Sequence, residues 1–554
     1  MKRFSVYFNK KSRLIKVPQL VSRRTTRLNS LRSNDLKQRL TELLQVQNDF
    51  FPCFDWTFPP PVLQPASQPG SVADLLAESS VIPDRYSLYL HTPFCKTLCK
   101  FCYYTVFPGN GIREAERYVD YLVREMQLYA PNMQGKKCES VYLGGGTPTY
   151  LDDRLLVKLL EKLRQHFELS DDVEITIEAA PGTLPRSKVD LLKSLGINRL
   201  SYGIQTLDEQ LLATMNRYYS VAEAIRELEY ARQQIGNVNV DTMYGFEDES
   251  DSALLNTLKT FNQLGIPSLS IYALDKQRCE SHVGEGPSID EHYERKIRLF
   301  EQAKTYLDRE GYQAVLQNIF VKPDQASYRH QLRRWDNLTL LALGIASQGY
   351  APRKPYQNAM TLKSYYQLLD ENKPPIVTVD ELSPEMEMAR ELTSKLRFTE
   401  VPIDAFNHKY GIELERVYAD LIQALNELGY LEKQDGSLRM TGAASYYNNI
   451  IPMLFAPDAF KRELLALPEE YLQHYPIPNI LTRIGETQSS SIDIRATDQD
   501  QLPVRERRQS NDRRLFQDTS YLSITGGIDR RHSVGRRIGD RQRYRSFVGD
   551  FLSS

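Results

Sequence analysis

Three cysteines fall within eight consecutive positions of the 554-residue chain, in the run Cys95-Lys-Thr-Leu-Cys99-Lys-Phe-Cys102. Thiolates are soft ligands that suit zinc or an iron–sulfur cluster. A structural zinc ion needs a fourth protein ligand, and the nearest candidate, His91, belongs to the preceding predicted strand. A four-iron cluster on three thiolates instead leaves one iron open to a substrate or a cofactor. The spacing therefore favours iron–sulfur.

The other three cysteines, Cys53, Cys138 and Cys279, are scattered along the chain. A disulfide framework is usually denser and belongs to a smaller chain, so these residues are interpreted as ordinary small side chains. This usage indicates a reducing compartment, and we expect a cytoplasmic protein.

The segments around the cysteines must form the scaffold that positions them. Apolar runs predict strands, and amphipathic periodicity between them predicts helices. Alternation of the two indicates a parallel sheet of right-handed crossover units. About six such units fit before residue 320, short of the eight in a closed barrel, so the sequence predicts an α/β fold with an incomplete (β/α)6 barrel. The predicted strands are 86–91, 140–143, 173–178, 199–203, 238–244 and 268–272.

Glycines and polar residues lie where the predicted strands end. Gly144, Gly145 and Gly146 close one strand, and Glu178, Gln205 and Asp241 lie at the ends of others. The carboxyl ends of the strands form the active-site face in such folds, so these residues are expected to meet in one site.

The cysteine spacing resembles that of the radical S-adenosylmethionine (SAM) superfamily, and Phe101 matches the aromatic residue often found before the third cysteine. Gly144-Gly-Gly-Thr147-Pro148 is similar to the superfamily segment that binds the SAM amino group. The resemblance implies a [4Fe–4S] cluster on Cys95, Cys99 and Cys102. It also implies reductive cleavage of SAM to methionine and a 5′-deoxyadenosyl radical.

Further segments narrow the resemblance to the oxygen-independent coproporphyrinogen III oxidase (dehydrogenase) subgroup. This branch includes haem chaperones and class C radical SAM methyltransferases. The similarity covers roughly residues 86–455. The segments that carry it are Tyr89-Leu-His-Thr-Pro-Phe-Cys95, Tyr142-Leu-Gly-Gly-Gly-Thr-Pro-Thr149, Glu178-Ala-Ala-Pro-Gly182, Arg199-Leu-Ser-Tyr-Gly-Ile-Gln205, Val240-Asp-Thr-Met-Tyr-Gly245, Leu343-Gly-Ile-Ala-Ser347, Thr441-Gly442 and Asn448-Asn-Ile450.

The resemblance implies a role for each matching residue. Glu178 would bind the SAM ribose or amino group, and Gln205 and Arg217 would contact its carboxylate and ribose region. Asp241 would line the second half of the cofactor site, and Tyr89 would pack beside the cluster. Tyr89 and Glu178 are the two predicted catalytic residues. The alternatives are that Glu178 and Asp241 are paired surface acids and that Arg217 forms a salt bridge at a helix end.

Two departures from the subgroup leave the reaction open. Tyr103 and Tyr104 replace the glycine and fourth cysteine of the coproporphyrinogen enzymes, and Gly245-Phe-Glu247 lacks their proline. Family analogy favours a tetrapyrrole substrate and an electron donor such as flavodoxin or ferredoxin. The alternatives are methyl transfer with a second SAM and a haem-binding trafficking protein with little turnover.

A second domain is expected at residues 375–455, after a radical SAM core at residues 86–350. Helices over 385–396 and 414–428 precede a hairpin that turns at Asp435-Gly436, a pattern typical of winged-helix-like α+β modules. Acidic residues on the second helix, such as Glu415 and Glu427, argue against nucleic-acid binding.

The ends of the chain differ in composition from the middle. Residues 1–85 form a basic, proline-rich extension, interpreted as a flexible arm in preference to an organellar transit segment. Residues 486–554 are Arg-rich and poor in core-forming residues, so disorder is expected there, with an RNA- or anion-binding tail as the alternative. No apolar run reaches the roughly 18–20 residues that span a bilayer.

Overall fold

The computed structural model describes residues 69–76, 84–109 apart from 103, 112–274, 289–441 apart from 317 and 399, 450–457, and the single residues 67, 444 and 460. The basic segment before residue 67, the Arg-rich segment 486–554, Cys53 and Cys279 lie outside this part of the chain. Within it, no helix has the length and apolar character of a membrane span.

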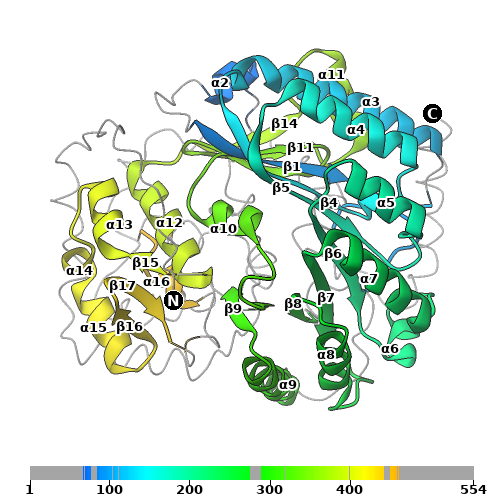
Figure 1. Ribbon diagram of the computed structural model, residues 1–554. Helices are drawn as coiled ribbons and strands as arrows, with labels where there is room; N and C mark the ends of the chain where they lie inside the picture. Colours follow the sequence, from blue (N-terminus) through cyan, green and yellow to red (C-terminus); the bar gives the residue numbers. More distant parts are fainter. Residues whose placement is uncertain are drawn as a thin grey trace, which may run out of the picture.

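A twelve-stranded mixed sheet forms the centre of the molecule (Figure 1). Its strand order is β14-β13-β12-β11-β1-β4-β5-β6-β7-β8-β10-β9. The strands from β11 through β8 in this order run parallel to one another, and the strands at both edges are antiparallel. The sheet does not close, which confirms the prediction of an incomplete barrel. Its parallel strands are β1 (Arg85–Thr92), β4 (Lys137–Gly145), β5 (Leu169–Ala179), β6 (Arg199–Gln205), β7 (Val238–Tyr244), β8 (Ser268–Ala273) and β11 (Leu340–Leu343).

The antiparallel edge strands were not predicted from the sequence. They are β9 (Gln313–Leu316) and β10 (Ile319–Val321) on one side, and β12 (Gln348–Ala351), β13 (Lys354–Asn358) and β14 (Ile376–Val379) on the other. The sheet thus continues past residue 350, where the sequence analysis placed the end of the core. These strands are only three to five residues long, too short for a clear alternating pattern.

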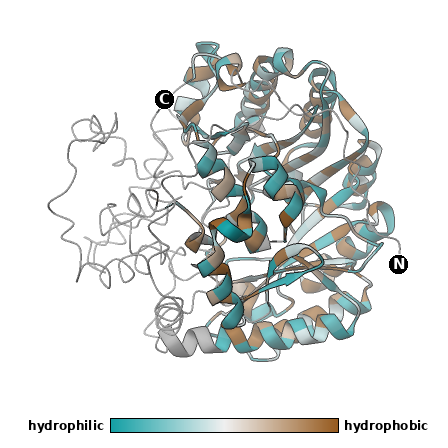
Figure 2. Ribbon diagram, turned by 90° about the vertical axis from the view of Figure 1, so that its left-hand side faces the viewer, coloured by the Kyte–Doolittle hydropathy of each residue, from teal (hydrophilic) through white to brown (hydrophobic). Residues whose placement is uncertain are grey.

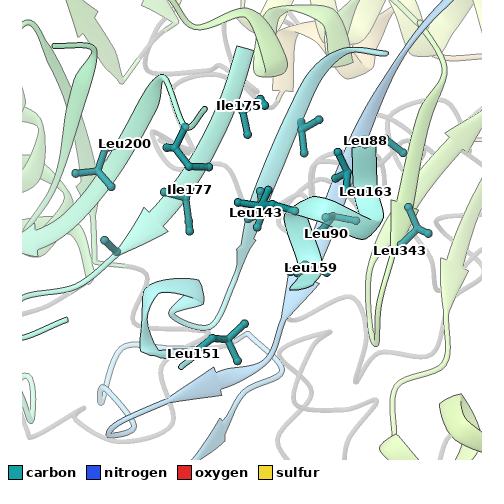
Figure 3. Packing of buried hydrophobic residues seen from close by; sticks show 14 of the residues in the cluster. Leu88, Leu90, Leu143, Leu151, Leu159, Leu163, Ile175, Ile177, Leu200 and Leu343 are labelled. Carbon is teal, nitrogen blue, oxygen red and sulfur yellow. The ribbon is translucent and has the colours of Figure 1, made fainter. Parts of the chain in front are cut away.

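Amphipathic helices cover the outer face of the sheet, and Figure 2 shows polar and apolar residues alternating along them. They are α3 (Ile112–Tyr129), α4 (Asp153–His166), α5 (Arg186–Ser194), α6 (Glu209–Thr214), α7 (Val221–Ile235), α8 (Ala253–Gln263), α9 (Ile289–Arg309) and α11 (Leu362–Asp370). Asp152 caps α4 by accepting a hydrogen bond from the Arg154 N–H, as its position before an apolar repeat suggests. Leucines of α4 pack against Leu88, Leu143 and Ile175 of the strands (Figure 3).

One short helix lies inside the region assigned to the N-terminal extension. This helix, α2 (Val72–Leu76), buries Val72, Leu75 and Leu76 in the main hydrophobic core, and Lys354 donates to the Asp74 carbonyl at 3.2 Å. The folded part of the chain therefore begins before the predicted boundary at residue 86. Its five residues are too few for a periodic signal to stand out in the sequence.

A separate helical and β domain follows the sheet, as predicted. It contains the three-stranded sheet β15-β17-β16, made of β15 (Val401–Pro402), β17 (Ser437–Met440) and β16 (Leu431–Gln434). Its helices are α12 (Pro384–Phe398), α13 (Ile403–Tyr410), α14 (Leu414–Val417), α15 (Ala419–Glu427) and α16 (Ile450–Leu454). The β16–β17 turn has positive φ at Asp435 and Gly436, as the predicted hairpin requires.

The predicted helix 414–428 is interrupted at Tyr418, whose φ of −114° separates α14 from α15. The Tyr418 ring packs edge-on against Phe455, and its hydroxyl donates to the Phe455 carbonyl at 3.1 Å. Contact with a distant part of the chain thus outweighs local helix propensity here.

Candidate functional site

The carboxyl ends of the parallel strands surround a cavity of about 790 Å³. Most residues that the sequence analysis singled out line this cavity: Tyr89, Cys95, Cys99, Cys102, Gly145, Gly146, Thr147, Glu178, Gln205, Arg217 and Asp241. Gly144 does not line it. A Cβ atom at Gly144 would lie 2.9 Å from the Tyr142 ring and 3.1 Å from the Glu178 carboxyl group, so this glycine makes room for two side chains of the site.

The three cysteines lie on the loop that follows β1. Cys95 belongs to the two-residue strand β2 (Phe94–Cys95), which pairs with β3 (Phe107–Pro108) and so closes the loop at its base. The loop is also fixed across the cavity, because Lys100 N–H donates to the Met215 carbonyl at 3.1 Å and the Asn216 amide donates to the Leu98 carbonyl at 2.6 Å. All three thiols are half-buried and unlinked by disulfides.

The three thiols line the cavity without a further metal-binding side chain converging on them in the described part of the chain. Among the described residues, no three His, Cys, Asp or Glu side chains converge closely enough to bind one metal ion. His91 is not available as a fourth ligand, because its ring is held by Tyr89 and Thr105.

His91 forms the floor beneath the glycine turn. Its Nε2 lies 3.1 Å from the Thr105 carbonyl, which can only accept, so Nε2 carries the proton and Nδ1 accepts from the Tyr89 hydroxyl at 3.1 Å. Burial lowers the pKa of His91 to about 4, so the ring is neutral at physiological pH. Tyr89 in turn stacks on Tyr142, with ring centroids 6.1 Å apart.

The glycine turn packs directly on this histidine. Gly145 has a φ of +107°, and a Cβ atom there would lie 2.4 Å from the His91 ring. A Cβ atom at Gly146 would lie 2.7 Å from the Phe94 carbonyl oxygen. The glycines therefore bring the end of β4 against the strand that leads to the cysteines.

Glu178 is half-buried and accepts two hydrogen bonds at the end of β5. The donors are the Tyr142 hydroxyl at 2.8 Å and the Gly145 N–H at 3.1 Å. Burial, together with the nearby charge of Asp241, raises the pKa of Glu178 to about 7. Glu178 is thus part of the cavity wall, which excludes the alternative of a surface acid.

Asp241 is held by a polar layer beneath the cavity. Its carboxylate accepts from the Ser201 hydroxyl at 2.9 Å and from the Asn239 amide at 2.8 Å. Asn239 accepts in turn from Ser268 at 2.7 Å and from Ser270 at 3.1 Å. Burial raises the pKa of Asp241. Four short polar side chains on neighbouring strands thus fix the direction of one carboxylate.

Gln205 and Arg217 also line the cavity. Gln205 follows an irregularity in the β6–β7 register and has a φ of +76°, which is uncommon for a residue with a side chain. Arg217 donates to the Gly203 carbonyl at 2.6 Å and lies over the Tyr219 ring at 5.6 Å. No ion pair involving Arg217 occurs among the described residues, so the alternative of a helix-end salt bridge is not supported there.

His330 lines the cavity and was not identified from the sequence. It lies on α10 (Arg329–Trp335), whose N-terminal N–H groups at Arg329 and His330 donate to buried Glu174 at 3.0 Å each. The Ser140 hydroxyl donates to Ser87 at 2.7 Å, so His330 Nδ1, 3.0 Å away, donates to Ser140. A lone histidine without a spacing motif gives no signal in the sequence.

His330 consequently offers a lone pair to the cavity. Burial and the positive charges of Arg334 and Arg199 lower the pKa of His330 to about 3, so the ring is neutral. With Nδ1 protonated, Nε2 is an acceptor, and it has no hydrogen-bond partner within the described residues. A neutral imidazole whose other nitrogen is fixed by a hydrogen bond is suited to bind a metal or an N–H donor.

Comparison with known proteins agrees with this geometry. Residues 89–261 match the family model of the radical SAM superfamily, and residues 382–447 match the HemN C-terminal domain. The haem chaperone HemW of Bacillus subtilis is 26% identical over 370 residues, which cover 66% of this chain and 97% of that protein. The oxygen-independent coproporphyrinogen III oxidase of Salmonella typhimurium is 26% identical over 405 residues, which cover 69% of this chain and 87% of that protein.

The fold has a counterpart among solved structures. Coproporphyrinogen III oxidase (HemN) from Escherichia coli superposes with a TM-score of 0.62 at 23% identity, over 75% of this chain and 98% of that one. The chain therefore combines a radical SAM domain with a HemN C-terminal domain and is homologous to the oxygen-independent coproporphyrinogen III oxidases and the haem chaperones HemW.

Proposed function

We propose that the chain is a radical SAM enzyme that holds a [4Fe–4S] cluster on Cys95, Cys99 and Cys102 and binds SAM in the adjoining cavity. The observation that carries the proposal is the single cavity in which these cysteines face Glu178 and Asp241, although the three features lie on different strands and loops. When bound, the cluster would supply the electron that splits SAM into methionine and a 5′-deoxyadenosyl radical.

The polar groups of the cavity suit the two ends of SAM. The N–H groups of Gly145, Gly146 and Thr147 are already bonded to protein oxygens, so the turn can offer only its carbonyl oxygens and the Thr147 hydroxyl. Such acceptors match an ammonium donor. Glu178 and Asp241 would accept from the ribose hydroxyls or the amino group, and the Arg217 guanidinium would attract the carboxylate.

The substrate proposed is a tetrapyrrole or another planar conjugated molecule. Two relatives carry names that refer to coproporphyrinogen or haem, which supports this class. Rings of Tyr142, Tyr272 and Tyr328 line the same cavity and would pack against a flat apolar surface. The same space would admit a second SAM, as a methyltransferase requires. We propose flavodoxin or ferredoxin as the electron donor.

A haem-binding trafficking protein is the second candidate, and His330 is the observation that favours it. Its unpartnered Nε2 provides the kind of imidazole ligand that haem iron takes. Titration of haem into the purified protein should separate the candidates, because ligation by His330 predicts a Soret shift that His330→Ala abolishes. A spectrum unchanged by that substitution would remove His330 as ligand.

The enzymatic proposal is tested by loading the protein with iron anaerobically. We expect about four irons per chain and visible absorption in the wild type, and loss of both in Cys102→Ala. With dithionite and SAM, the loaded wild type should release 5′-deoxyadenosine even without substrate. Cys138→Ala is the matched control, because Cys138 is buried in β4 and donates to the Ser140 carbonyl. Loading with zinc in place of iron would contradict the proposal.

A further inference from the structure

Arg199 is a completely buried cation at the start of β6. Its side chain is the largest of those fully enclosed within the described residues. The guanidinium lies over the ring of Tyr328, which lines the cavity, at 4.4 Å, and Nε donates to the Ser327 carbonyl at 3.0 Å. Nη2 has no hydrogen-bond partner, and no acidic side chain of the described residues forms an ion pair with Arg199. A buried charge is costly unless other charges nearby compensate for it.

The strand geometry places Arg199 close to the two acids of the cavity. Residues two apart on a strand point to the same face of the sheet, so Arg199 and Ser201 share one side of β6. Ser201 donates to Asp241 at 2.9 Å, and it is opposite Glu178 in the register of β5 with β6. Both acids are therefore held near Ser201, which is one repeat of the pleat from Arg199, a spacing of roughly 7 Å.

The charges around the two acids differ in their exposure to water. Burial raises the pKa of both Glu178 and Asp241, and the positive charge of Arg199 opposes this rise. A third buried acid, Glu174, already accepts hydrogen bonds from the Ser327 hydroxyl and from two N–H groups of α10. The charged side chains that line the rest of the cavity are half-buried or exposed, namely Lys96, Arg217, Glu223 and Arg334. Water and salt screen these groups more than they screen Arg199.

The other titratable groups near the two acids do not supply a positive charge. They are Tyr89, Tyr142, Tyr272, Tyr328, His330 and the thiol of Cys95, which belongs to the cluster in the proposed function. Burial raises the pKa of these tyrosines and lowers the pKa of the histidine, so all five side chains are neutral near neutral pH. Arg199 is thus the buried cation that faces the two carboxylates.

We propose that Arg199 is a positioning residue of the site, whose buried charge keeps Glu178 and Asp241 ionised and so makes the cavity select a cationic ligand. The inference rests on the proposed function, in which these two acids hold SAM. SAM carries an ammonium, a sulfonium and a carboxylate group and is a net cation, whereas S-adenosylhomocysteine lacks the sulfonium and is neutral overall. Two ionised carboxylates in a cavity shielded from water favour the first ligand over the second, and protonated carboxyl groups do not.

The pH dependence of SAM binding is measured first, by equilibrium dialysis with the cluster-loaded protein. Arg199→Met removes the charge but keeps an unbranched side chain, and it should move the midpoint of the binding profile up by about one pH unit. Below the midpoint the Kd should be about tenfold weaker, because one pKa unit corresponds to a factor of ten, and at pH 9 it should approach the wild-type value. Arg199→Lys retains a positive charge and should keep the wild-type midpoint.

Arg390→Met is the matched control for the loss of a buried arginine. Arg390 is also buried and also lies over a tyrosine ring, that of Tyr350 at 4.1 Å, but it belongs to the C-terminal domain. Its substitution should leave the midpoint of SAM binding unchanged.

The affinities for SAM and S-adenosylhomocysteine are then compared at pH 7. The preference for SAM should fall severalfold in Arg199→Met and persist in Arg199→Lys. Equal losses for the two ligands would show that Arg199 only supports the shape of the cavity, and an unchanged midpoint would show that its charge does not act on the acids. Either result would overturn the inference, and so would a lysine variant that behaves like the methionine variant. Failure of the wild type to bind SAM at any pH would instead refute the proposed function.

Discussion

A single imidazole fixes the relation between the cysteine loop and the glycine turn. His91 is neutral and buried, and both ring nitrogens are bonded to the residues around it. Gly145 lies against this ring, and its N–H donates a hydrogen bond to the Glu178 carboxylate. A substitution that disturbs the contact between Gly145 and His91 should therefore change both the support of the cysteine loop and the direction of the Glu178 carboxylate.

Substitution of Gly145 by alanine should disrupt the site. The new Cβ atom would meet the His91 ring at 2.4 Å, in a backbone conformation with φ of +107° that alanine rarely adopts. We expect SAM affinity to fall by at least tenfold, measured by equilibrium dialysis. Gly182→Ala is the matched control, because Gly182 has a φ of +81° but no atom within 4 Å of the added Cβ. Equal effects of the two substitutions would show that backbone strain alone is responsible.

Glu178 should make SAM binding sensitive to pH. Its pKa of about 7 means that the carboxylate becomes fully ionised, and the better acceptor, only as the pH rises through neutrality. Wild-type affinity for SAM should therefore increase between pH 6 and pH 8, and Glu178→Gln should flatten the profile. Glu178→Ala should weaken SAM by about five- to a hundredfold, a loss of about 1–3 kcal/mol. Wild-type affinity in the alanine variant would remove Glu178 from the site.

At the scale of elements, helix α3 connects the cluster strand to the turn after β11. Tyr118 of α3 donates to the His91 carbonyl at 2.7 Å and accepts from the Ile345 N–H at 3.0 Å. Glu125, seven residues on, accepts from Gly344 N–H at 2.7 Å, Tyr365 at 2.6 Å and Asn358 at 2.8 Å. One face of a helix thus determines where the wall near Ala346 and Ser347 lies.

Glu125 should impose a pH dependence on stability. Burial raises its pKa from 4.5 to about 7 in the folded state. Between these values only the folded state holds the proton, so the free energy of unfolding falls as pH rises through this window, by about 3 kcal/mol, and is constant above it. Glu125→Gln should remove this part of the dependence, measured by urea unfolding at pH 5 and pH 8. Glu116→Gln, on the exposed side of α3, should retain it.

The sequence predicted elements better than contacts. The strand 238–244 was predicted to the residue, and β1, β4, β5, β6 and β8 to within a few positions, because their apolar runs end in glycine or polar residues, whereas β11 was not predicted. The cysteine and glycine motifs are also local patterns, and they identified part of the cavity wall. His330 and Glu125 could not be found this way. Each is a single polar residue whose meaning comes from partners far away in sequence, which no local pattern encodes.

At the scale of the whole molecule, one buried arginine joins the two domains. Arg390 of α12 lies over the Tyr350 ring of β12 at 4.1 Å, and its Nε and Nη1 have no hydrogen-bond partner among the described residues. Burial lowers its pKa. Helix α10 also contacts β1, β4 and α12, so the HemN C-terminal domain lies against elements that line the cavity (Figure 1).

Loss of this arginine should loosen the C-terminal domain. Arg390→Ala removes the cation–π contact with Tyr350 and one of the positive charges near Glu387 and Glu391, at a cost of about 2 kcal/mol or more. We expect faster proteolytic cleavage after residue 380 while the core fragment stays intact on a gel. Arg390→Met retains the volume without the charge and should behave closer to the wild type. Cleavage of the alanine variant at the wild-type rate would contradict the interpretation.

The order of the strands also dictates when the molecule can finish folding. Strand β1 pairs with β4 on one side and with β11 on the other, where Ser87 is opposite Leu340. During synthesis the edge of β1 that pairs with β4 can be covered early, but the edge that pairs with β11 stays open until the chain has grown past residue 343. Pairing across so long a loop is slow and exposes an unpaired edge to other nascent chains. Strand β1, which leads into the cysteines, is thus enclosed later than β4 to β8, although these are synthesised after it, and a group held by the cysteines would meet a fully paired β1 only after residue 343 has been made.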